Sequence, residues 1–221
     1  MLKTVAVSGA SGKTGYRVAE ELQNLNINTR LLLRPTSIVP DSLTECEQSR
    51  LSLFNQQALD NALTGIDALV IATGARPSID LTSPMRVDAW GVKSQIESCQ
   101  RVGVRRVILV SSLCAGQWKH VLNLFGLILV WKRVGERAVE TSGLDWTVIR
   151  PGGLSEREDE LAGEGIRWSG PNQQDSNSIP RRLVAQSCVE ALQTPASIGQ
   201  ILEITSSKDL QPSSMSSYLS Q

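Results

Sequence analysis

The amino-acid sequence predicts an α/β protein with a doubly wound parallel sheet, folded as a single domain. Short apolar runs alternate along the chain with stretches of helical periodicity, which is the pattern of a parallel sheet covered by helices on both faces. A glycine-rich turn also stands between the first apolar run and the first helical stretch. The 221 residues are enough for one substantial core. We therefore expect one domain over residues 1–205, with small substrate-pocket elements from about residue 151 and a polar, largely unstructured tail over 206–221.

The individual elements follow from the same periodicities. Strands are expected where apolar runs are bounded by polar or turn residues, with 51–53 the weakest and 163–169 at a sheet edge: 3–8, 29–33, 51–53, 67–72, 105–111, 145–150, 163–169 and 200–205. Helices are expected after the glycine turn, from about residue 84, over 130–138 and over 182–192.

Composition and charge exclude several classes of protein. The 22 basic and 22 acidic side chains cancel, so no global field favours a nucleic-acid partner, and we expect none. The most apolar stretch, 122–131, is too short for a transmembrane segment. An N-terminus that enters a strand at once predicts a cytoplasmic protein without a signal segment. Four widely spaced cysteines are expected to be thiols in a reducing compartment, with no metal site: Cys46, Cys99, Cys114 and Cys188.

The turn over residues 8–15 has the spacing of a dinucleotide-binding site. Its first glycine allows a tight exit from the strand, its second lets backbone N–H groups approach a pyrophosphate, and its third lets the next helix pack against the sheet. The alternative is a glycine-rich surface turn, but the strand before it and the helix after it favour the phosphate site. Six residues of the turn are expected to bind cofactor: Gly9, Ser11, Gly12, Lys13, Thr14 and Gly15.

The end of the second strand indicates which dinucleotide binds. NAD-binding domains place an acidic residue there for the ribose 2′-hydroxyl, but no acid occurs between Glu21 and Asp41. Arg34 stands there instead, and a guanidinium matches a 2′-phosphate with two charge-assisted hydrogen bonds. We therefore predict NADP in preference to NAD. Arg30 is expected to be a strand residue without this role.

Three segments together resemble a known family. Residues 7–15, 103–112 and 142–154 are similar to those of the atypical short-chain dehydrogenase/reductases, and more narrowly to the NAD(P)-binding proteins of plants and cyanobacteria related to the import component Tic62. The resemblance covers about residues 1–205. It implies a Rossmann fold with strand order 3-2-1-4-5-6-7 and a cofactor across the C-terminal ends of the strands.

The resemblance also implies a catalytic set. It contains a serine after the fifth strand, Ser111 or Ser112, and a lysine on the next helix, Lys132. In ordinary members a tyrosine four residues before the lysine transfers the proton, but this chain has Ile128 there. The cofactor contacts implied beyond the glycine turn and Arg34 are Ala72, Thr73, Gly74, Ser111, Lys132, Pro151 and Gly152.

Other groups are weaker candidates for proton transfer. His120 lies on the loop after the serine strand, and Cys114 follows the serines closely, but a surface histidine and a buried structural cysteine are the simpler interpretations. The carboxylates over 156–160 have no spacing that singles out an acid and a base.

Two functions therefore stay open from the sequence. One is an NADP-dependent oxidoreductase that transfers hydride to an acceptor needing no tyrosine acid, such as a quinone or a flavin. The other is a non-catalytic sensor or scaffold that responds to NADP. The acceptor, the protein partner and the oligomeric state are not predicted.

Overall fold

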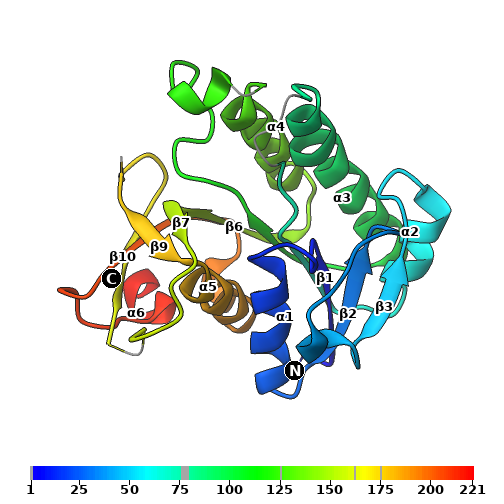
Figure 1. Cartoon of the computed structure of the whole chain (residues 1–221), viewed down its shortest axis with the longest axis horizontal. Helices are drawn as coiled ribbons and strands as arrows, with labels where there is room; N and C mark the ends of the chain where they lie inside the picture. The colour runs from blue at the N-terminus through cyan, green and yellow to red at the C-terminus, as the bar shows by residue number, and fades with distance from the viewer. Residues whose placement is uncertain (1, 76–79, 125, 162, 175) are drawn as a thin grey trace.

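A computed structural model describes residues 2–75, 80–124, 126–161, 163–174 and 176–221 of the chain. Its centre is an eight-stranded sheet in the order β3-β2-β1-β4-β5-β6-β10-β8 (Figure 1). All neighbouring strands are parallel except the edge pair β10 and β8. The strands are β1 (Thr4–Ser8), β2 (Asn28–Leu33), β3 (Glu47–Arg50), β4 (Ala68–Ile71), β5 (Arg106–Val110), β6 (Asp145–Pro151), β8 (Gly165–Ser169) and β10 (Gln200–Ser207). The doubly wound fold and the implied strand order are confirmed, with β10 as the seventh strand.

Helices cover both faces of this sheet (Figure 1). One face carries α1 (Gly15–Asn24) and α5 (Arg181–Gln193), whose buried apolar side chains form one core cluster with the sheet. The other face carries α2 (Gln56–Leu63), α3 (Gly91–Val102) and α4 (Ile128–Glu140). Their apolar side chains form a second cluster. A π-helical turn, η2 (Met85–Trp90), leads directly into α3 where the sequence predicts a single helix.

Two further details differ from the sequence prediction. The third strand is β3 at Glu47–Arg50, not 51–53, because a polar edge strand carries no apolar run. A second, two-stranded sheet pairs β7 (Gly153–Ser155) with β9 (Ser178–Pro180) in the region expected to form the substrate pocket. Three short 3₁₀ turns, η1 (Asp41–Leu43), η3 (Val121–Leu124) and η4 (Pro195–Ser197), complete the described elements.

The expectation of a largely unstructured tail over 206–221 is wrong. β10 extends to Ser207, and the chain then forms α6 (Met215–Leu219). The Met215 side chain is fully buried in the same core cluster as α5, and its backbone N–H donates to Glu190 Oε1 at 2.6 Å. Trp168 Nε1 donates to the carbonyl of Ser213 at 3.1 Å. One buried methionine and a few backbone hydrogen bonds fix the tail, and its serine-rich composition does not reveal them.

The structure also describes the features that composition addressed, which are the cysteines, the helices and the potential metal ligands. All four cysteines are thiols, and burial raises the pKa of both Cys99 and Cys188 to about 12. Within the described residues, none of the helices has the length and apolar character needed to cross a bilayer. The same residues contain no cluster of three or more potential metal ligands.

Candidate functional site: a dinucleotide cavity

The glycine turn packs so closely that two of its glycines cannot carry a side chain. Gly9 has a φ of 84°, and a Cβ there would lie 2.7 Å from the carbonyl oxygen of Ala72. A Cβ at Gly15 would lie 2.2 Å from the carbonyl oxygen of Gly9. The Gly12 N–H closes the turn on the Gly9 carbonyl at 2.8 Å. Thr14, the N-cap of α1, makes no side-chain cap, and the N–H of Tyr16 donates to the Gly12 carbonyl at 3.0 Å. The N-terminal end of α1 points its positive dipole at the turn, which favours an anion there.

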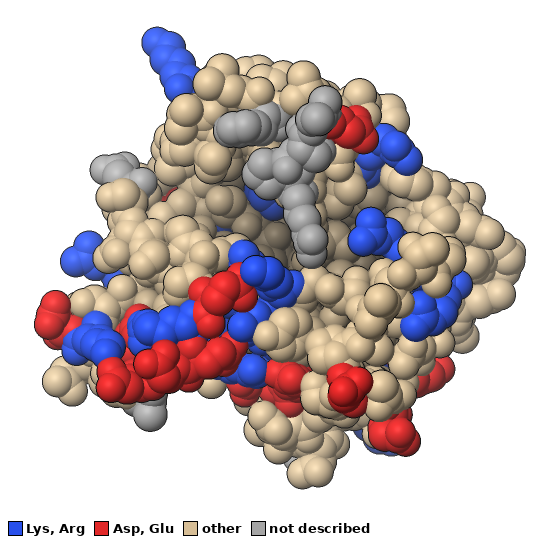
Figure 2. Space-filling model, in the orientation of Figure 1, with Lys and Arg blue, Asp and Glu red and all other residues tan. Residues whose placement is uncertain are grey.

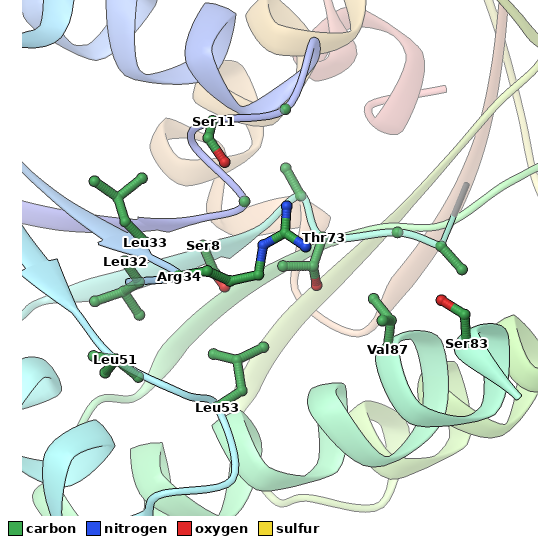
Figure 3. A pocket seen from close by; sticks show the side chains of 15 residues that line it. Ser8, Ser11, Leu32, Leu33, Arg34, Leu51, Leu53, Thr73, Ser83 and Val87 are labelled. Atoms are coloured by element: carbon green, nitrogen blue, oxygen red, sulfur yellow. The ribbon is translucent and has the colours of Figure 1, made fainter. Parts of the chain in front are cut away.

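A cavity of about 440 Å³ lies beside this turn, at the C-terminal ends of β1, β2 and β4. Figure 3 shows the residues around it, contributed by the glycine turn, the end of β2, the segment after β3, the loop after β4 and the start of η2. Seven predicted cofactor residues line it: Gly9, Ser11, Gly12, Arg34, Ala72, Thr73 and Gly74.

Arg34 is the one cation among the described residues that line the cavity. Figure 3 shows its side chain reaching across the cavity toward Thr73. Among the described residues its guanidinium has no hydrogen-bond or ion-pair partner. Arg30, by contrast, contacts the carbonyl of Ala62 at 2.8 Å and Glu47 at 2.8 Å, and so joins β2 to its neighbours. A ligand phosphate in the cavity would therefore meet Arg34.

One end of the cavity is apolar, and the sequence analysis missed it. Leu32, Leu33, Leu51 and Leu53 form this wall (Figure 3). The sequence analysis placed residues 51–53 in a strand and therefore did not assign Leu51 and Leu53 to the cavity. In the structure both lie just after β3 and line the cavity. Such a wall suits the flat face of a nucleobase.

Four other predicted cofactor residues make contacts within the protein. The Lys13 ammonium pairs with Glu156 at 3.0 Å, and the Thr14 hydroxyl accepts a hydrogen bond from Arg181 at 3.0 Å. The Pro151 carbonyl accepts the N–H of Leu113 at 2.9 Å, joining the chain after β5 to β6. A Cβ at Gly152 would lie 2.4 Å from the carbonyl oxygen of Asn177, so this glycine permits the close approach of the β9 segment. None of these four residues lines the cavity.

Three hydroxyls at strand ends are buried without a hydrogen-bond partner among the described residues. They are Ser8 at the end of β1, Thr73 after β4 and Ser111 after β5. Ser8 and Thr73 line the cavity, while Ser111 and the half-buried Ser112 lie outside its wall. Buried polar atoms are normally satisfied, so these hydroxyls indicate a ligand or water at the strand ends.

Lys132 lies next to the cavity, held by an acid that sequence reasoning missed. Its Nζ is 2.9 Å from Asp88 Oδ1, and the Asp88 side chain is 2% exposed. A Cβ at Gly74 would lie 3.6 Å from Nζ. Ile128, one turn before Lys132 at the start of α4, is buried and supplies no hydroxyl. The one sequence signal for this role was that Asp88 is the single acid in the segment Met85–Trp90, which leads into α3.

The remaining acid–base candidates lie in other surroundings. His120 Nδ1 accepts the N–H of Leu122 at 3.2 Å, which is a local contact of the loop after β5. The carboxylates after β7 form ion pairs, and Glu158 contacts both Arg17 and Arg182. Burial by itself would raise the pKa of Glu158, but the hydrogen bonds from the two arginines outweigh it and lower that pKa. Figure 2 shows this acidic and basic band across the surface near α1 and α5. The run over 156–160 is thus a structural ion-pair surface.

Comparison with known proteins agrees with this site. A family model described as NAD(P)H-binding matches residues 9–195. The chain belongs to this NAD(P)H-binding family. An uncharacterised chloroplast protein of Arabidopsis thaliana is 32% identical over 216 residues, covering 91% of this chain and 76% of that protein. Sanguinarine reductase of Eschscholzia californica is 29% identical, covering 86% of this chain and 84% of that enzyme. Protein TIC 62 of Pisum sativum is 29% identical over 68% of this chain but only 32% of its own length.

Solved structures with the same fold include two whose names mention a nicotinamide dinucleotide. A putative NAD-dependent epimerase/dehydratase from Bacillus halodurans superposes with a TM-score of 0.85 at 25% identity, over 100% of both chains. A short-chain dehydrogenase/reductase from Veillonella parvula in complex with NADP superposes with a TM-score of 0.74 at 17% identity, over 99% of this chain and 98% of that one. The chain is therefore an NAD(P)-binding Rossmann protein related to the Tic62-like proteins and reductases, as its motifs predicted.

Proposed function

We propose that the protein is an NADP-dependent oxidoreductase that transfers hydride to an acceptor of the quinone or flavin type. The observation that carries the proposal is the Arg34 guanidinium, which reaches into the cavity and has no partner among the described residues. None of the described residues that line the cavity is acidic, so none of them would accept a ribose 2′-hydroxyl as NAD-specific domains do. The neighbour from Veillonella parvula binds NADP, which is consistent with this preference.

The chain's own residues would divide the work of binding. The turn at Gly12 and the N-terminal end of α1 suit the pyrophosphate, and Arg34 suits the 2′-phosphate. Lys132 lies behind Gly74, where a cation would hold the nicotinamide ribose. When bound, the nicotinamide supplies the hydride, and the protein orients it.

The acceptor class follows from what surrounds Lys132. With Ile128 in place of a tyrosine, no positioned phenol protonates an alkoxide, which disfavours ordinary aldehydes and ketones. Exposed apolar side chains gather on two segments that touch where Gly126 packs against the Leu81 backbone. They are Leu81, Trp118, Val121, Leu122, Leu124 and Leu127. No acidic residue occurs over 111–135. An apolar, flat acceptor suits this surface.

Turnover of a panel of acceptors tests the proposal. NADPH oxidation is followed with water-soluble quinones, flavins, aldehydes and ketones, and Gly12→Val serves as the control that lacks the cofactor site. We expect oxidation with quinones or flavins and very slow oxidation with simple carbonyls. Rapid reduction of simple carbonyls, or oxidation by Gly12→Val at the wild-type rate, contradicts the proposal.

A non-catalytic NADP sensor is the second candidate, and Ile128 is the observation that favours it. A protein that binds NADPH tightly but oxidises it with none of these acceptors fits the sensor and not the oxidoreductase.

A further inference from the structure

Asp88 is the most deeply buried carboxylate near the cavity. It lies on η2, where its side chain is 2% exposed, and its backbone carbonyl packs against α4 so closely that a Cβ at Gly135 would lie 2.1 Å from it. An isolated charge in such a place is costly unless it is paired and hydrogen-bonded. The contacts of Asp88 therefore require an explanation.

Both carboxylate oxygens of Asp88 are engaged. Oδ1 accepts from Lys132 Nζ at 2.9 Å, and Oδ2 accepts from the backbone N–H of Ala75 at 3.1 Å. Ala75 lines the cavity, as does its neighbour Gly74. One side chain thus fixes two things at once: the position of the ammonium and the path of the loop after β4.

The position of Gly74 connects this pair to the cavity. A Cβ there would lie 3.6 Å from Lys132 Nζ and 3.7 Å from Asp88 Oδ1, so the missing side chain leaves only backbone beside the pair. An ammonium with one carboxylate partner keeps two further N–H donors. Lys132 can thus pair with Asp88 and still donate to a ligand at this wall of the cavity.

We propose that Asp88 is a positioning residue for the cofactor, which acts through Lys132 by holding its ammonium at the wall of the dinucleotide cavity beside Gly74. The inference rests on the proposed cofactor site and deepens it. In this arrangement the lysine's fixed partner is a carboxylate, which cannot serve as the missing phenol, so the lysine serves cofactor binding. Asp88 itself touches no reacting atom.

A double-mutant cycle tests the inference by cofactor affinity as well as by activity. The variants are Asp88→Asn, Lys132→Met and the two combined, and NADPH affinity is measured from nicotinamide fluorescence in each. Asp60→Asn is the matched control, because Asp60 pairs with Arg101 at 2.8 Å between α2 and α3, outside the cavity wall. Melting curves verify that each variant is folded at the temperature of the titration.

If Asp88 acts through Lys132, Asp88→Asn weakens NADPH binding about tenfold, the size expected for a charge-assisted hydrogen bond. The combined variant then binds no more weakly than Lys132→Met alone, and Asp60→Asn binds like the wild type. Unchanged affinity in Asp88→Asn, or the same loss with and without Lys132, overturns the inference.

Two further outcomes keep the test decisive. Asp88→Asn could fail to fold because a buried ammonium loses its partner. In that case two other variants are measured in its place. The combined variant removes both charges, and Asp88→Glu keeps the charge but displaces it. Asp88→Glu with wild-type affinity overturns the inference. Wild-type protein that binds NADPH but reduces no acceptor contradicts the oxidoreductase proposal and leaves this inference standing.

Discussion

The Lys13 ammonium lies 3.0 Å from the Glu156 carboxylate, which joins the glycine turn to the segment after β7. Glu156 also accepts from Arg181 at 2.9 Å, and Arg181 donates to the Thr14 hydroxyl. Glu156 also contacts Arg17 at 3.4 Å, so three cations beside the N-terminus of α1 share this acid. A cofactor phosphate at the turn competes with Glu156 for them.

Glu156→Gln is therefore expected to strengthen NADPH binding several-fold at low ionic strength, because Lys13 and Arg181 become available to phosphate. High salt should remove most of the gain, since these charges are exposed. The melting temperature should change little, because exposed ion pairs contribute about 0–1 kcal/mol. Fluorescence titration at two salt concentrations measures this. Affinity equal to wild type at low salt would show that Lys13 does not reach the phosphates.

Gly12 is the glycine whose replacement separates binding from folding. A Cβ at this position meets only the Gly9 carbonyl, at 3.1 Å, so the turn can adjust, yet the side chain of a valine would project where a pyrophosphate approaches. Gly12→Val is expected to lose NADPH binding and keep its circular dichroism spectrum. Gly163→Val, where a Cβ has nothing within 4 Å, is the matched control. Retained binding in Gly12→Val would place the phosphates elsewhere.

Met215 tests whether the C-terminal segment is part of the folded domain. Its side chain is fully buried beneath α6, so Met215→Ala should lower the free energy of unfolding by about 2–5 kcal/mol. Ser216→Ala, at an exposed neighbouring position, is the control. Urea denaturation measures both variants. A Met215→Ala protein as stable as wild type would mean that the tail contributes nothing to the core.

Ile128→Tyr restores the hydroxyl that is missing one turn before Lys132. The site is 7% exposed, so the larger ring should cost about 1–3 kcal/mol of stability. If the cavity otherwise supports carbonyl reduction, ketone reduction should rise by about 10² to 10⁴, the usual contribution of a positioned proton donor. Ile128→Phe controls for size without the hydroxyl. A tyrosine variant that binds NADPH normally and gains no more than the phenylalanine variant would favour the sensor.

The predicted features that are confirmed are those encoded locally. The glycine turn needs only the tight spacing of Gly9, Gly12 and Gly15, and the central strands β4 and β5 contain continuous apolar runs. The position of Arg34 beside the glycine turn could be predicted because the fold places the end of β2 next to that turn. These features do not depend on distant parts of the chain.

The features that were missed depend on distant contacts. Asp88 is recognisable only after Lys132 is seen beside it, and the polar strand Glu47–Arg50 forms because β2 offers it a free edge. The pairing of Lys13 with Glu156 was also missed, because Glu156 comes from a segment with no readable period. In each case the deciding partner lies far away in the sequence.

Calorimetric titration of wild type and Arg34→Ala, with NADP and with NAD, determines whether Arg34 makes the cavity selective for NADP. Arg105→Ala, at an exposed arginine outside the cavity, is the matched control. The account predicts that Arg34→Ala loses about 1–3 kcal/mol of NADP affinity and almost no NAD affinity, because only NADP carries the 2′-phosphate. Equal losses for both cofactors, or tighter binding of NAD by the wild type, would contradict it.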